Sequence, residues 1–326
     1  MKKNKKTIVI NSIKKRYPRV VFMGTPFIAV SALKALANRG YRIVAIVCQP
    51  DRPSGRKQTI TFSPVKEFAL KYNLKLFQPN KISDIYNELK NIKFDVIVTC
   101  AYGQFIPDKI LNMPKYGCIN VHASLLPKYR GGAPVHWALI NGEKETGVTL
   151  MKTIKQMDAG DCYVSYKISI LDDDNLKTLF KKIEKTIYLI IYHELENILN
   201  KKLTPIKQNE EFATKALNIT KEQEKLTFNM QAKNFVNWVK GLYEFPCAYV
   251  VYENGMKIKL YDVEVTDELS KLEPGTITSI RKEGIFVSTL DYNVKINEFK
   301  IEGKKRINIK DFYFGNKLFK INRKFF

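Results

Sequence analysis

The 326-residue sequence lacks any apolar run close to the about 20 residues that a membrane-spanning helix needs. Its five cysteines include no C-x-x-C pair, and no spacing typical of metal ligands is present. The signatures G-x-G-x-x-G and G-x-x-x-x-G-K-[ST] of dinucleotide and nucleoside-triphosphate sites are absent as well. These absences argue against a membrane protein, a disulfide scaffold, a metalloenzyme and the common nucleotide-binding enzymes.

Acidic side chains are scarce relative to basic ones. The chain carries 55 Lys and Arg against 32 Asp and Glu, a formal net charge of +23. Residues 1–19 contain eight basic residues and no acid, and residues 303–326 contain eight basic residues with Asp311 as the single acid. Both ends could attract the phosphates of RNA. A genome that enriches lysine would produce the same excess, so the charge alone does not decide between these two interpretations.

The cysteines are isolated from one another, and several lie inside apolar runs such as RIVAIVC and FDVIVTC. A reduced thiol packs in such a run as a small apolar group. With no secretory signal in view, this distribution predicts a cytoplasmic protein that does not associate with membranes. The lysine-rich first residues leave one alternative open, a transit peptide into an organellar matrix.

Short apolar runs alternate with helical spacing from Arg19 onward. Four runs are continuously apolar: residues 19–23, 42–48, 94–100 and 118–121. Three segments have helical spacing: residues 29–38, 64–72 and about 175–200. Continuous apolar strands are typical of a parallel sheet that is buried on both faces. We therefore predict an α/β fold, with a Rossmann-like doubly wound sheet at residues 19–202 after a basic extension at residues 1–18.

A different pattern follows in the last third of the chain. Residues 203–219, which include the polar stretch KQNEE, are predicted to form a linker. A helix near residues 232–242 and the short alternating runs after it predict a small β-barrel or sandwich at residues 220–326. The aromatic rings of the final segment YFGNKLFKINRKFF could stack on RNA bases. The segment also alternates in polarity, and we predict that it forms a last strand with alternating core residues.

Loops with unusual residues follow the predicted strands of the first domain. They are GTPF, QPDRPSGR, AYGQFIP and ASLLPKYRGGAP, and QMDAGD (156–161) follows a further strand candidate, GVTLMKT. Ligands of doubly wound sheets bind beyond the carboxyl ends of the strands. We therefore expect these loops to meet at that edge and to form the functional site.

Three polar residues in these loops suit acid–base chemistry. Asn120 and His122 alternate on one strand, so their side chains share a face. A histidine there can act as general acid or base, and an asparagine amide can donate to a developing oxyanion. Asp158 could orient the imidazole. No serine or cysteine is evidently partnered with them, which favours direct transfer between two bound substrates. A histidine with a purely structural role is the alternative.

Several stretches occur in a set order between about residue 20 and residue 161. They are VVFMGTP, QPDRPSGR, SPVKEFA, AYGQFIP, GCINVHASLLPKYRGGAP and ETGVTLMKTIKQMDAGD. With them the chain resembles the methionyl-tRNA formyltransferase family. The resemblance implies transfer of the formyl group of 10-formyltetrahydrofolate to the α-amino group of methionyl initiator tRNA, for translation initiation. It implies two partners, formyl-folate and the charged tRNA, and no metal, and we expect a monomer.

The resemblance also assigns roles to residues. It implies that Asn120, His122 and Asp158 are the catalytic trio. It implies a tRNA-contacting role for Arg56 and Lys57, and an OB-like, tRNA-binding barrel at residues 220–326. The residues that it assigns to formyl-folate are Tyr102, Gly103, Ile106, Pro107, Ser124, Leu125, Leu126 and Pro127.

Two other functions fit the same sequence. A formyltransferase that acts on an amino sugar nucleotide would share the trio and a similar C-terminal subdomain. A noncatalytic RNA-binding protein on the same scaffold would account for the basic tails. The loop QPDRPSGRK favours the tRNA over the sugar nucleotide, and the intact trio argues against a noncatalytic protein.

Overall fold

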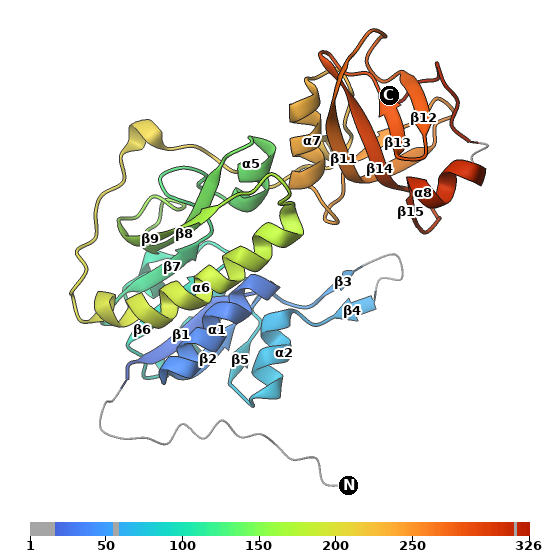
Figure 1. Ribbon diagram of the computed structural model, residues 1–326. Helices are drawn as coiled ribbons and strands as arrows, with labels where there is room; N and C mark the ends of the chain where they lie inside the picture. Colours follow the sequence, from blue (N-terminus) through green and yellow to red (C-terminus); the bar gives the residue numbers. More distant parts are fainter. Residues whose placement is uncertain (1–16, 55–58, 316–317) are drawn as a thin grey trace. The chain divides into compact units, whose positions relative to one another are not determined.

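A seven-stranded sheet in the order β5-β2-β1-β6-β7-β8-β9 organises the first of two units (Figure 1). The computed structural model describes residues 17–54, 59–315 and 318–326, so most of the basic extension lies outside the described residues. Strands β5, β2, β1, β6 and β7 are parallel, which confirms the predicted doubly wound core. The strands are β1 (Arg19–Gly24), β2 (Arg42–Val47), β5 (Leu76–Phe77), β6 (Val96–Cys100), β7 (Cys118–His122), β8 (Glu145–Lys152) and β9 (Cys162–Ser169).

Helices cover both faces of this sheet. On one face, α1 and α6 lie side by side (Figure 1), and Arg39 Nη2 donates to Glu196 Oε2 at 2.7 Å. On the other face, Leu89 and Ile110 share a buried cluster with Ile97 of β6. The described helices are α1 (Phe27–Arg39), α2 (Pro64–Lys71), α3 (Tyr86–Lys90), α4 (Asp108–Leu111) and α6 (Leu176–Leu199), with 3-10 turns η1 (Ile82–Ile85) and η2 (Glu210–Phe212). None of the described helices is long and apolar enough to cross a membrane.

Strand β8 runs antiparallel to β7, with Thr149 beside His122 and Lys152 beside Ile119. The carboxyl end of β8 therefore lies near the start of β7. It is at the opposite end of the sheet from the carboxyl ends of the parallel strands. The loop 156–161 must fold back to reach the end of β7. The expectation that this loop leaves its strand at the common edge is wrong, because apolar patterning reports burial but not strand direction.

A two-stranded hairpin, β3 (Arg52–Ser54) and β4 (Thr59–Thr61), follows β2. Its connection, residues 55–58, lies outside the described residues, and so do Arg56 and Lys57. Asp51 forms an ion pair with Lys66 at the first turn of α2 and accepts a hydrogen bond from Gln78 Nε2 at 3.0 Å. The hydrogen bonds from Lys66 and Gln78 hold the pKa of Asp51 below its usual value. These contacts anchor the base of the hairpin.

The second unit contains residues 133–146, 169–180 and 217–326. Its antiparallel sheet has the order β10-β11-β14-β13-β12, with β15 paired to β14. The strands are β10 (Tyr249–Val251), β11 (Lys257–Leu269), β12 (Ile277–Arg281), β13 (Gly284–Val287), β14 (Tyr292–Ile301) and β15 (Arg306–Asn308). The described helices are α5 (Pro134–Ile140), α7 (Ala232–Gly241) and α8 (Ile309–Phe312), with 3-10 turns η3 (Glu222–Glu224) and η4 (Tyr313–Gly315).

The last residues of the chain join the two edge strands of this sheet. Phe326 N–H donates to the Val251 carbonyl of β10 at 2.6 Å, and Ile277 N–H of β12 donates to the Arg323 carbonyl at 2.8 Å. The sheet thereby closes into a barrel, and its free edges are covered. The prediction of a regular last strand is wrong, because residues 313–315 form a 3-10 turn and, within residues 318–326, only Lys324 and Phe325 pair with the sheet, as isolated bridges.

We expect Phe325→Ala to destabilise the barrel by roughly 3–5 kcal/mol. The Phe325 ring is 3% exposed and packs against Tyr252, Phe228 and Phe319 with ring centroids 5.3–5.8 Å apart. Urea unfolding followed by tryptophan fluorescence measures the effect, since both tryptophans belong to the second unit. The matched control is Phe314→Ala, whose ring is 81% exposed; equal losses in the two variants would contradict the prediction.

Candidate active site

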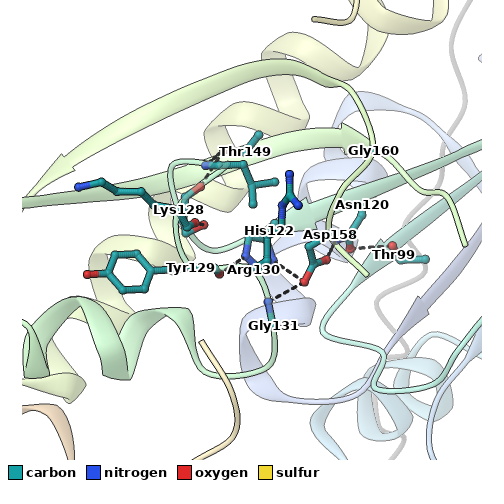
Figure 2. A network of polar contacts seen from close by, with 12 residues as sticks. Thr99, Asn120, His122, Lys128, Tyr129, Arg130, Gly131, Thr149, Asp158 and Gly160 are labelled. Carbon is teal, nitrogen blue, oxygen red and sulfur yellow. Dashed lines mark hydrogen bonds and ion pairs between the residues drawn. The ribbon is translucent and has the colours of Figure 1, made fainter. Parts of the chain in front are cut away.

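Strand β7 places Asn120 and His122 on one face, as the strand period requires (Figure 2). The neighbouring strand β6 fixes the asparagine, because Thr99 Oγ1 donates to Asn120 Oδ1 at 2.8 Å. The amide nitrogen of Asn120 therefore points the other way and donates to Asp158 Oδ1 at 3.3 Å. A primary amide has two N–H donors, so Asn120 keeps one donor for a ligand beyond its bond to Asp158.

His122 is 5% exposed, and a hydrogen bond through one ring nitrogen holds it. Its Nε2 lies 2.8 Å from the carbonyl oxygen of Tyr129. A carbonyl oxygen can only accept, so Nε2 carries a proton and donates it to this bond. The other nitrogen, Nδ1, lies 3.7 Å from Asp158 Oδ2. Nδ1 is therefore the position at which the ring can take up a proton, beside a carboxylate that would stabilise the resulting charge.

Asp158 completes the trio from the loop that folds back from β8. Its Oδ2 accepts the backbone N–H of Gly131 at 2.9 Å, while its Oδ1 accepts the Asn120 amide (Figure 2). The carboxylate thus contacts both members of the pair on β7 and the chain that follows it. The structure brings together the three residues that the sequence singled out, in an arrangement suited to proton transfer next to a hydrogen-bond donor.

Residues 214–216 fix the peptide groups that surround the trio. Tyr129 N–H donates to Thr214 Oγ1 at 2.8 Å, and Ala216 N–H donates to the Arg130 carbonyl at 2.7 Å. A Cβ on Gly131 would lie 2.6 Å from the Ala216 carbonyl oxygen, and Gly131 has φ of 125°. Glycine is therefore required for the two backbones to approach this closely.

The loop Ser124–Pro127 is built as a support with an apolar outer surface. Ser124 is fully buried, and its hydroxyl donates to the Lys128 carbonyl at 2.7 Å. Thr149 Oγ1 of β8 donates to the Ser124 carbonyl at 2.7 Å. The side chains of Leu125, Leu126 and Pro127 are half-buried. Of this predicted set, the two leucines and the proline offer side-chain surface to a ligand, and Ser124 holds the loop.

The residues of the segment Tyr102–Pro107 also differ in how far their side chains are exposed. The side chains of Tyr102 and Ile106 are buried in the cluster beneath the sheet, whereas Gly103 is exposed and Pro107 is half-buried. The Tyr102 carbonyl accepts Gln49 Nε2 at 3.1 Å, which ties this loop to the one after β2. Tyr102 and Ile106 can therefore reach a ligand only through their backbone.

Comparison with known proteins decides the family. Residues 18–194 match the family model described as formyl transferase, and residues 218–317 match the formyl transferase C-terminal domain. A methionyl-tRNA formyltransferase of Malacoplasma penetrans is 52% identical over 95% of this chain and 97% of its own length. The methionyl-tRNA formyltransferase of Bacillus subtilis is 40% identical over 91% of this chain and 94% of its own. The chain belongs to the methionyl-tRNA formyltransferase family. It is therefore a transferase.

Solved structures support the fold of this family member. The sugar 3N-formyl transferase WlaRD, crystallised with dTDP and 5-N-formyl-THF, matches 89% of the chain and 100% of its own with a TM-score of 0.65. Its sequence identity is 18%, so the likeness concerns the fold. An α/β sheet domain followed by an antiparallel β domain is thus a shared architecture.

Cysteine chemistry does not compete with the trio at this formyltransferase site. Burial raises the pKa of the Cys100 and Cys118 thiols to about 12 and that of Cys162 to about 11. These thiols stay protonated near neutral pH and are poor nucleophiles. The other two histidines lie elsewhere: His136 Nδ1 is 2.8 Å from the Gly241 carbonyl within the second unit, and His193 is exposed on α6.

Sequence reasoning missed the residues that orient the trio. Thr99 had a signal, since it is a polar side chain inside the apolar run FDVIVTC. The Tyr129 carbonyl and the Gly131 N–H had none, because any residue provides these groups. Thr214 and Gln208 fall in the segment interpreted as a linker, where polar side chains are expected to face solvent.

Proposed function

We propose that this enzyme transfers the formyl group of 10-formyltetrahydrofolate to the α-amino group of methionyl initiator tRNA. The convergence of Asn120, His122 and Asp158 carries the proposal. Relatives named as methionyl-tRNA formyltransferases at 40–52% identity over more than nine-tenths of the chain support the choice of acceptor. The reaction belongs to translation initiation.

Each member of the trio has a distinct role in this proposal. His122 Nδ1 takes the proton that the attacking amine loses and returns it to N10 of the folate as the bond between the formyl carbon and N10 breaks and tetrahydrofolate leaves. The ring stays oriented by its Nε2–H bond to Tyr129. The second N–H of Asn120 donates to the oxygen on which negative charge develops. Asp158 stabilises the protonated ring and holds the Asn120 amide in place. No covalent enzyme intermediate is required.

The fit of the formyl donor rests on the two loops beside the trio. Half-buried Leu125, Leu126 and Pro127 offer an apolar surface to the flat ring system of the folate. Gly103 is exposed and has no side chain, so the ring system can approach the backbone there. Gln104 fixes the second loop by accepting the Ile82 N–H at 2.8 Å. Binding surfaces that are set before the ligand arrives lose little entropy on binding.

The test offers both candidate acceptors to the full-length protein with 10-formyltetrahydrofolate. Charged initiator tRNA is the first acceptor, and a dTDP-linked amino sugar is the second. We expect formyl-methionine after hydrolysis of the ester and no formylated sugar. Formylation of the sugar alone would overturn the proposal, and no transfer to either acceptor would favour the noncatalytic alternative.

Arg56→Ala should weaken productive binding of charged tRNA by about 10-fold and leave formyl-folate binding unchanged, as loss of one phosphate contact predicts. Arg56 and Lys57 lie between β3 and β4, whose base Asp51 anchors. Apparent affinities for both ligands measure the effect, with Arg42→Ala, exposed at the start of β2 and so at the opposite end of that strand from the hairpin, as a matched control. A loss confined to formyl-folate would place this loop at the donor site instead.

Other parts of the proposal concern the whole chain. We propose that the enzyme acts in the cytoplasm as a monomer and without a metal. The relatives named above are bacterial, and an organellar location gains no support from them. The division into a catalytic domain at residues 19–202, a linker at 203–219 and a tRNA-binding, OB-like domain at 220–326 stays a prediction.

A further inference from the structure

One side chain of the predicted linker is buried beside the catalytic loop. Gln208 is 7% exposed. Its Nε2 donates to two backbone carbonyls of that loop, Asp158 O at 2.9 Å and Gly160 O at 2.7 Å. Its Oε1 accepts Arg130 Nε at 3.0 Å and Nη2 at 2.9 Å. Both N–H groups and both lone pairs of the amide are therefore used, as a buried amide requires.

The loop that Gln208 holds is not in a conformation that its own residues favour. Asp158 has φ of 49°, in the left-handed region, which Asp and Asn tolerate better than most side chains but which still costs free energy. A Cβ on Gly160 would lie 1.8 Å from the Lys152 carbonyl oxygen, so the loop passes directly against the end of β8. A loop folded back in this way needs bonds from outside, and Gln208 supplies two at the residues that flank Ala159.

Arg130 fixes Gln208 in turn. Its guanidinium donates to Gln208 and also pairs with Glu210, at 2.8 Å between Nη2 and Oε1. The Glu210 carboxylate raises the pKa of Arg130 further above its ordinary value, so the guanidinium is permanently charged. Because Arg130 directly precedes Gly131, the same short stretch of chain holds Asp158 through the Gly131 N–H and holds Gln208 through its side chain.

We propose that Gln208 is a positioning residue for formyl transfer. It keeps the Asp158 carboxylate at His122 Nδ1 and at the Asn120 amide, without contacting either substrate. The proposal rests on the proposed function of the trio. Displacing a reacting group by about 1 Å can reduce a rate by about 100-fold. Loss of Gln208 should therefore lower kcat and leave both KM values nearly unchanged.

Two substitutions separate the contacts of Gln208. Gln208→Met keeps the side-chain length and removes all four hydrogen bonds. Gln208→Glu keeps the acceptor for Arg130 but loses both donors and sets a carboxylate against two carbonyl oxygens. We expect each variant to lower kcat about 10- to 100-fold per folded molecule, with KM for formyl-folate and for charged tRNA within about 3-fold of wild type. The control Glu211→Gln, at an exposed position of η2 three residues from Gln208, should stay within about 3-fold.

A double-mutant cycle tests whether Gln208 acts through Asp158. In an Asp158→Asn background, Gln208→Met should cost less than about 3-fold, since the group that it positions is already lost. An equal loss in both backgrounds, or a variant that melts earlier but turns over normally once folded, would overturn the proposal. If Gln208→Met does not fold, the same cycle with Gln208→Glu decides. Failure of the wild type to formylate charged tRNA would instead refute the proposed function, and the cycle would then be run with the acceptor that is formylated.

Discussion

His122→Ala lowers the single-turnover rate of formyl transfer at least about 100-fold, while charged tRNA and formyl-folate bind with nearly unchanged affinity. The substitution removes the Nδ1 atom that takes up the proton, 3.7 Å from Asp158. It leaves the apolar loop at residues 124–127 in place, because Ser124 and Thr149 hold that loop independently of the imidazole. The variant should therefore lose catalysis and keep its binding of both ligands.

The measurement is the amount of formyl-methionine released by hydrolysis after a single turnover, with affinities taken from separate binding titrations. His193→Ala, on an exposed position of α6, is the matched control and should match the wild type. Near-normal transfer by His122→Ala would show that the histidine is structural. Equal losses of both affinities would show a folding defect.

Asp158→Asn should lower the same rate by about 100-fold through two effects. The neutral side chain no longer stabilises the protonated His122 ring. Its amide also has one oxygen where the carboxylate has two, and those two oxygens accept the Asn120 amide and the Gly131 N–H at 3.3 and 2.9 Å. One of these donors must then face an NH₂ group, which disturbs Asn120 or the chain at Gly131.

Single-turnover rates at saturating substrate isolate this effect from binding. Asp161→Asn, in the same loop but outside the trio, is the control and should stay within about 3-fold of the wild type. If both aspartate variants lost the same factor, the loop as a whole would be sensitive to charge, and the specific role of Asp158 would be wrong.

The sequence allowed the pair on β7 to be found because the strand period is strict. Asn120 and His122 two residues apart must share a face, and a continuous apolar run before them marked the strand. The loop residues and the family resemblance both pointed to Asp158, but neither showed from which end of its strand the loop starts. Strand direction is decided by which edges pair in three dimensions, and the antiparallel β8 changed where its loop starts.

The contacts that orient the trio could not be predicted from the sequence, because they use backbone groups and residues far apart in the chain. The Tyr129 carbonyl and the Gly131 N–H are backbone groups and leave no composition signal. Gln208 contacts residues 48 and 50 positions earlier in the chain, and a polar residue in a polar stretch gives no sign of burial. Such long-range bonds are set by tertiary packing, after local preferences have been satisfied.

The hydrogen bonds from residues 208–216 have a consequence for where this chain can be cut. The formyl transferase match ends at residue 194, and a fragment that ended there would carry the whole trio. It would lack three residues that hydrogen-bond to the loops of the trio. Gln208 bonds to Asp158, Thr214 to Tyr129, and Ala216 to Arg130. A junction placed after residue 216, where the first unit ends, keeps these bonds with the catalytic half.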